Sequence, residues 1–137
     1  MQSLSYLASQ EIIIFEWASA IHETPIKEFV RATQNDILSL PYPTSLISIQ
    51  LEQNECITGI NTDSAFIPDT SLEFSSKVCP CLNQYQAILE VAFSQPWESV
   101  LQKVKEIVAE YPEILMVTIV NITERKYQFP EPDSEAW

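Results

Sequence analysis

Basic residues are scarce in this chain of 137 residues, and long apolar runs are missing altogether. Seven lysines and arginines stand against 19 acidic residues, which gives a net charge of −12. Because phosphate neutralisation supplies most non-specific affinity for nucleic acids, this balance counts against tight, autonomous nucleic-acid binding. No apolar run approaches the ~20 residues that span a bilayer, so no membrane association is expected.

Cysteine and histidine are also rare. The three cysteines are Cys56, Cys79 and Cys81, and His22 is the only histidine. An odd number of cysteines argues against a disulfide framework. A zinc site would need Cys56 and His22 as well as the C-x-C pair, so reduced thiols are the simpler interpretation. The first five residues lack the basic region of a signal peptide, and we expect an intracellular protein, cytoplasmic or nuclear.

Apolar residues make up 46% of the chain, enough for a real core, and the length predicts one domain over 1–137. Apolar residues return at helical spacing over 4–20, although 12–15 alone is compatible with a strand. A second, shorter helix is expected after Thr24. Strands are expected over 45–51 and 56–67, the latter bent at Gly59, the only glycine. Residues 70–83 are predicted to form a long polar loop.

The clearest pattern lies between residues 86 and 122. An apolar run over 86–93 predicts a buried strand, and Ser94 or Gln95 caps a following helix with Pro96 in its first turn. A second buried strand covers 114–122, so the unit is a β-α-β crossover with parallel strands. The expected fold is therefore α/β or α+β, a small mixed sheet flanked by helices. After Glu124 we expect a loop, and the abrupt end at Trp137 is consistent with a C-terminal truncation.

Glu90 is the one charged residue inside the apolar run, where a carboxylate is costly unless it is paired. Asp63 opens the second half of the strand predicted over 56–67. Two strands would thus aim carboxylates at one point, a geometry that can hold a divalent cation. Two plainer interpretations stay open. Glu90 could be a strand-end carboxylate that pairs with Lys103, and Asp63 could accept hydrogen bonds in an Asx turn.

The segments 61–66 and 89–95, followed by the helix and the last strand, resemble the restriction-endonuclease-like PD-(D/E)XK nuclease superfamily, in particular its divergent fungal members. The resemblance covers roughly residues 55–125. It implies a restriction-endonuclease-like core in which two acids bind Mg²⁺ or Mn²⁺ beside the scissile phosphate. Asp63 corresponds to the first acid and Glu90 to the second. The lysine expected two residues later is replaced by Ala92.

Several residues are candidates for the missing roles. Lys103 and Lys105 in the helix could supply the cation of the missing lysine, as in some superfamily members. Gln95 could also occupy the position of that lysine, although glutamine carries no charge. Pro68-Asp69 is a literal Pro-Asp pair and an alternative for the first acid, but it follows the predicted strand, where we expect it to cap a turn. From the N-terminal region, Glu11, Glu16 or His22 could complete a metal site, whereas a histidine at a helix end more often complements the helix dipole.

The sequence thus leads to two hypotheses. The first is a divergent metal-dependent nuclease-like domain that hydrolyses nucleic-acid phosphodiesters. The second is a catalytically inactive nuclease fold that acts as an acidic protein-binding or assembly module, with a protein partner or a second copy of the chain. Ala92 and the net charge favour the second, and the two strand-borne acids favour the first.

Overall fold

The computed structural model describes residues 2–8, 11–17, 19–79, 81, 83–93 and 95–123. The predicted loop after Glu124 and the proposed cap Ser94 lie outside these residues. In chain order the elements are β1 (Gln2–Leu7), β2 (Ile12–Trp17), α1 (Ala20–Ser39), β3 (Ile47–Gln53), β4 (Ile57–Thr58), β5 (Ala65–Phe66), β6 (Thr70–Ser76), β7 (Asn83–Phe93), α2 (Trp97–Glu110) and β8 (Met116–Ile122).

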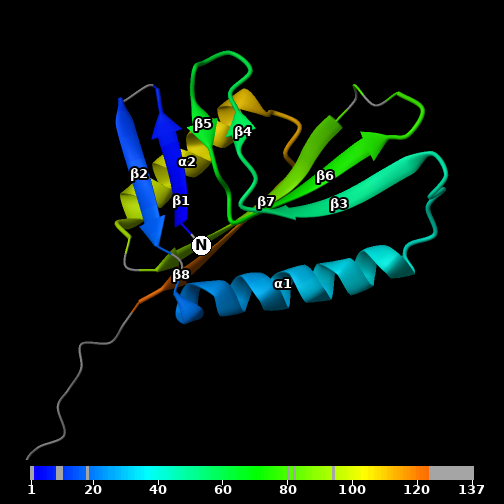
Figure 1. Cartoon of the computed structure of the whole chain (residues 1–137), viewed down its shortest axis with the longest axis horizontal. Helices are drawn as coiled ribbons and strands as arrows, with labels where there is room; N and C mark the ends of the chain where they lie inside the picture. Colours follow the sequence, from blue (N-terminus) through cyan, green and yellow to red (C-terminus); the bar gives the residue numbers. More distant parts are fainter. Residues whose placement is uncertain are drawn as a thin grey trace, which may run out of the picture.

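A mixed sheet forms the centre of the domain, with strand order β3-β6-β7-β8. The first three strands are antiparallel, and β8 runs parallel to β7 after the α2 crossover. The predicted α+β class and the β-α-β unit are therefore present. A smaller sheet of order β2-β1-β5-β4 stands beside α2 (Figure 1).

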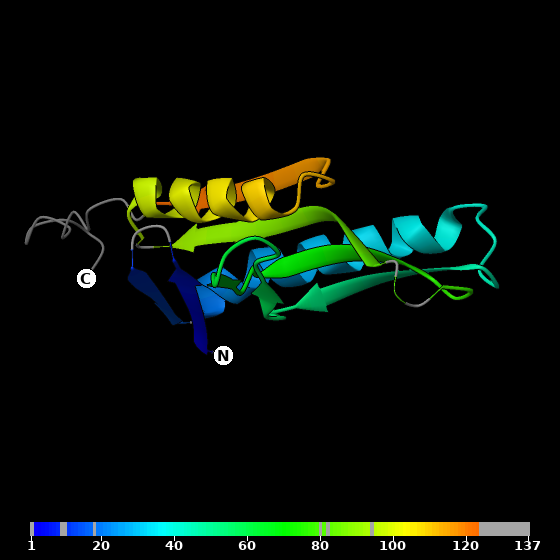
Figure 2. The ribbon, with the colours of Figure 1, turned by 90° about the horizontal axis from the view of Figure 1, so that it is seen from above.

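The two faces of the central sheet bury different apolar clusters. On one face Ile26 and Val30 of α1 pack against Leu89 and Val91 of β7. On the other, Ile88 meets the apolar stripe of α2 and residues of the small sheet, and Figure 2 shows α2 lying along β7. Since successive side chains of a strand point to opposite faces, Glu90 shares the α2 face with Ile88.

The structure corrects several sequence-based expectations. Helix α2 begins at Trp97 with Pro96 as its N-cap, so Gln95 does not cap it and Pro96 is not in its first turn. Gln2–Leu7 and Ile12–Trp17 form the antiparallel strands β1 and β2 where a helix was expected, because Ile12–Phe15 is a run of β-branched and aromatic residues that favours a strand. The loop expected over 70–83 is largely β6, in which Thr70, Ser71 and Glu73 are buried and Leu72 is half-buried. The helix expected after Thr24 begins at Ala20, since Ser19 caps it by accepting a hydrogen bond from His22 N (3.2 Å).

Candidate functional site

Glu90 lies in the middle of the domain on β7, with 2% of its surface exposed. Its Oε2 accepts a hydrogen bond from Lys103 Nζ at 2.9 Å. Lys103 belongs to α2, is 1% exposed, and also donates to the backbone oxygen of Ile67 at 2.8 Å. An ion pair this deep is stable only when both partners are satisfied, so the α2 lysine and the β7 carboxylate depend on each other.

Asp69 is the second buried carboxylate and directly precedes β6. The register pairs Thr70 of β6 with Leu89 of β7, which brings Asp69 next to Glu90 across the two strands. Asp69 Oδ2 accepts a hydrogen bond from Val91 N at 2.6 Å. The carboxylate thus takes the place of the backbone acceptor that β6 would supply if it continued, because β7 extends to Phe93 beyond the end of the pairing.

His22 approaches the same carboxylate from α1. Its Nε2 lies 3.3 Å from Asp69 Oδ1, and the side chain is buried. Since His22 belongs to the first turn of α1, Asp69 also lies near the positive end of the helix dipole, which favours a negative charge. Two buried contacts therefore flank strand β7, His22 with Asp69 and Lys103 with Glu90, and these four side chains are here called the acid cluster.

The segment that carries Asp69 is fixed by the small sheet. Ile67 N donates a hydrogen bond to Ser5 Oγ of β1 at 3.0 Å, and the oxygen of the same residue accepts from Lys103. Ala8 N in turn donates to Ser64 Oγ at 3.1 Å. The N-terminal hairpin is thus joined to the segment that leads into β6, and the position of Asp69 depends on both sheets.

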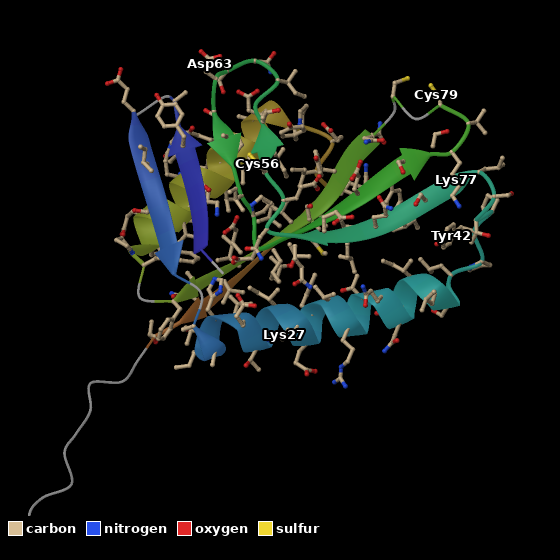
Figure 3. All side chains as sticks on the ribbon, viewed as in Figure 1. Lys27, Tyr42, Cys56, Asp63, Lys77 and Cys79 are labelled. Carbon is tan, nitrogen blue, oxygen red and sulfur yellow. The ribbon has the colours of Figure 1, made fainter. Side chains whose placement is uncertain are left out.

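The residues predicted from the sequence lie in three different settings. Glu90 and Lys103 are in contact, whereas Asp63 is exposed on the loop between β4 and β5, at its outer end in Figure 3. The expectation that Asp63 converges with Glu90 is therefore wrong, because 57–66 folds into the short β4 and β5 strands of the small sheet, which direct that loop outward. Lys105 is exposed on α2, and Gln95 is half-buried in the β7–α2 connection.

Asp69 and His22 are the members of the acid cluster for which the sequence favoured other roles, a turn cap and a helix-end histidine. Pro68-Asp69 was expected to cap a turn, yet it opens a strand. The available signal was the alternation of Thr70–Ser76, which marks a half-buried strand, and the Pro-Asp pair at its start. Asp63 is exposed in a turn where Ser64 N donates to Thr62 Oγ1 (3.3 Å), so the hydroxyl of Thr62 makes the recorded turn bond and the Asx turn at Asp63 stays a prediction.

The donor set of the acid cluster is compatible with Mg²⁺ in kind. Within the described ranges, no group of three or more His, Cys, Asp or Glu side chains could hold a metal ion. Mg²⁺ needs fewer, because it keeps several waters and is often held by one or two carboxylates together with phosphate oxygens. Asp69 Oδ1 is buried, and His22 Nε2 lies 3.3 Å from it, so a cation at this oxygen would take the place of the imidazole.

Comparison of the chain with protein-family models, curated proteins and solved structures returned no match. None of the described helices is long and apolar enough to cross a membrane.

Proposed function

We propose that this chain is a divergent metal-dependent nuclease-like domain that hydrolyses phosphodiesters. Asp69 and Glu90 would hold Mg²⁺ or Mn²⁺, and Lys103 would supply the cation. The observation that carries the proposal is the contact of Glu90 with a lysine of the following helix at 2.9 Å, on a strand whose neighbour is preceded by the buried Asp69. Asp69 thus replaces Asp63 as the proposed first acid.

The resemblance to the PD-(D/E)XK superfamily supports this proposal. The superfamily has an acidic residue that opens one strand and a second acid on a following strand. Asp69 stands directly before β6, and Glu90 lies on β7 beside it. Ala92 occupies the usual lysine position and is buried. Lys103 reaches Glu90 from α2 instead, the substitute position suggested for some superfamily members.

Each side chain has a defined part in the proposed site. A bound divalent ion would act as a Lewis acid on the phosphate and lower the pKa of its water. Val91 N donates to Asp69 Oδ2 and holds the carboxylate in position. The other oxygen, Oδ1, lies beside His22. The ammonium group of Lys103 now donates to Glu90 and could donate to a phosphate oxygen instead. His22 contributes an imidazole beside Asp69.

A second candidate function is an inactive nuclease fold that acts as an acidic protein-binding module. Two observations favour it. All four side chains of the acid cluster are less than a tenth exposed, so a phosphate must displace part of their cover to reach them. The net charge of −12 also repels nucleic acid. The two proposals differ in whether Asp69 and Glu90 bind a metal and turn over a substrate.

Nuclease activity is the test. The full chain is incubated with plasmid DNA and with single-stranded RNA in the presence of Mn²⁺ or Mg²⁺, beside the variants Asp69→Asn and Asp63→Asn. The proposal predicts cleavage of at least one substrate, a loss of more than about 100-fold in Asp69→Asn, and unchanged activity in Asp63→Asn. Circular dichroism checks that Asp69→Asn is folded. If neither substrate is cut, the nuclease proposal fails and the binding module remains.

A further inference from the structure

Two cysteines meet at the opposite end of the central sheet, in the connection between β6 and β7. The last pair of the ladder joins Ser75 to Asn83, and Cys79 and Cys81 lie in the loop beyond it. Figure 3 shows Cys79 at the outer end of this connection, away from the loop that carries Asp63. The acid cluster does not include these residues, so their chemistry is independent of the proposed function.

The two sulfur atoms are close enough to react with each other. Cys79 Sγ lies 3.0 Å from Cys81 Sγ, within hydrogen-bonding distance for thiols. Both cysteines are free thiols; Cys81 is exposed and Cys79 is partly exposed. Cys56 is also free and exposed, but no other sulfur is recorded in contact with it among the described residues. The chain therefore offers a thiol pair and a single thiol as an internal reference.

The loop is held in a shape that keeps the pair together. Ser76 Oγ accepts hydrogen bonds from Val78 N at 3.3 Å and from Cys79 N at 3.1 Å. These bonds fix the backbone on the β6 side, while pairing of β7 with β6 fixes the other side through Asn83. Because one residue separates the two cysteines, closing a ring between them costs little chain entropy.

We infer that Cys79 and Cys81 form a redox-active dithiol that exchanges with a small disulfide such as oxidised glutathione. One cysteine sulfur, as thiolate, attacks the glutathione disulfide, forms a mixed disulfide and releases one glutathione thiolate, which takes up the proton that the cysteine lost. The second cysteine then attacks the sulfur of the first, forms the Cys79–Cys81 disulfide and releases the second glutathione. The two protein thiols lose two electrons and two protons, and one glutathione disulfide is reduced to two thiols.

Exposure determines the behaviour expected of this disulfide. Exposed disulfides have more oxidising potentials than buried structural ones and are labile. The Cys79–Cys81 bond is therefore expected to open again in excess reduced glutathione. The pair would thus act as a reversible modification site at the end of the β6–β7 hairpin.

The test is alkylation of the full chain after incubation with oxidised glutathione, followed by mass spectrometry. In wild type a linkage between Cys79 and Cys81 is expected in a digest, and a stable glutathione adduct is expected only at the single thiol Cys56. Cys56→Ser should lose both of its thiols. Cys81→Ser cannot close the ring, so a stable glutathione adduct should accumulate at Cys79. Reduced glutathione in excess should restore every thiol.

The inference is overturned if all three wild-type thiols stay alkylatable. It is equally overturned if wild type accumulates separate glutathione adducts on Cys79 and Cys81 as fast as on Cys56. All three cysteines are exposed or partly exposed, so the serine variants are expected to fold, and wild type alone decides the outcome if one does not. Failure here leaves the acid cluster and its nuclease test untouched.

Discussion

Lys103 Nζ lies 2.9 Å from Glu90 Oε2 although the two residues belong to different elements and neither is exposed by more than 2%. This pair joins α2 to the central strand β7 inside the domain. A buried charge that loses its partner is far more costly than the whole pair is worth, because desolvation is no longer offset. Stability and the proposed chemistry therefore share the same two side chains.

Removing the ammonium alone should destabilise the protein strongly. We expect Lys103→Met to lower the free energy of unfolding by about 3–5 kcal/mol, because Glu90 then stays buried without its cation. Lys105→Met, on the exposed side of the same helix, should change it by less than about 0.5 kcal/mol. Urea denaturation followed by circular dichroism measures both. Equal effects of the two substitutions would show that the Glu90–Lys103 ion pair does not contribute to stability.

The double variant Glu90→Leu/Lys103→Met separates loss of the pair from exposure of one charge. Since both charges disappear together, its free energy of unfolding should lie closer to wild type than that of Lys103→Met. The same urea denaturation measures it. A double variant less stable than the single one would contradict this account of the pair.

The carboxylate of Asp69 accepts the hydrogen bond of Val91 N next to the start of β6. Asp69→Ala leaves that buried donor without an acceptor and should cost about 1–3 kcal/mol of unfolding free energy. Asp63→Ala, on the exposed loop, should be neutral within about 0.5 kcal/mol. Thermal and urea unfolding of the two variants compare the carboxylates directly. A larger loss from Asp63 than from Asp69 would refute the assignment of the cluster.

Glu73 should make stability depend on pH in the acidic range. Burial raises the pKa of its carboxyl group, and the neighbouring Glu55 and Glu52 raise it further. A raised folded-state pKa means that the stability this group contributes is present in full below its unfolded pKa and is lost as pH rises through the folded one. Glu73→Gln should therefore stabilise the protein at neutral pH by about 0.2–1 kcal/mol.

The advantage of Glu73→Gln should shrink as pH falls through the raised pKa of folded Glu73 toward 4.5, the ordinary value for glutamate, and be absent below it. Unfolding free energies of wild type and variant, measured between acidic and neutral pH, test this sign. Glu98→Gln, on the exposed start of α2, serves as the matched control. If the stability of Glu73→Gln relative to wild type instead increases as pH falls, the surroundings stabilise the carboxylate of Glu73 rather than destabilise it.

Gly59 should resist substitution because of the loop that follows it. A Cβ at this position would lie 2.8 Å from the backbone oxygen of Thr62, so the backbone must shift. We expect Gly59→Ala to cost about 1–3 kcal/mol, compared with little for the exposed Ile60→Ala. Since this loop also carries Asp63, an unaltered metal affinity in a folded Gly59→Ala variant would agree with a site that does not use Asp63.

Local periodicity was sufficient to predict the crossover of β7, α2 and β8. Their apolar patterns are long and unambiguous, and the contact between Glu90 and Lys103 was among the alternatives that the sequence left open. The N-terminal hairpin was misread because Leu4 to Ile21 also fits helical spacing. Only pairing of β1 with β2, Leu4 opposite Phe15, decides between the two. Strand pairing depends on tertiary contacts and cannot be read from the local periodicity of the sequence.

The acid cluster was half predictable for a related reason. A carboxylate inside an apolar run, as at Glu90, signals a buried partner. Asp69 carries no such signal, because a Pro-Asp pair is also typical of a turn. Its role follows from strand register, which places Thr70 opposite Leu89, and from the approach of α1, which brings His22 within 3.3 Å. Neither relationship can be read from local spacing.

Metal binding by the two carboxylates is the central claim, and calorimetric titration of Mn²⁺ into the full chain tests it most directly. The account predicts that wild type binds with millimolar or tighter affinity, that Asp69→Asn loses this binding while remaining folded, and that Asp63→Asn retains it. Absence of binding to wild type, or binding that survives in Asp69→Asn and disappears in Asp63→Asn, would contradict it.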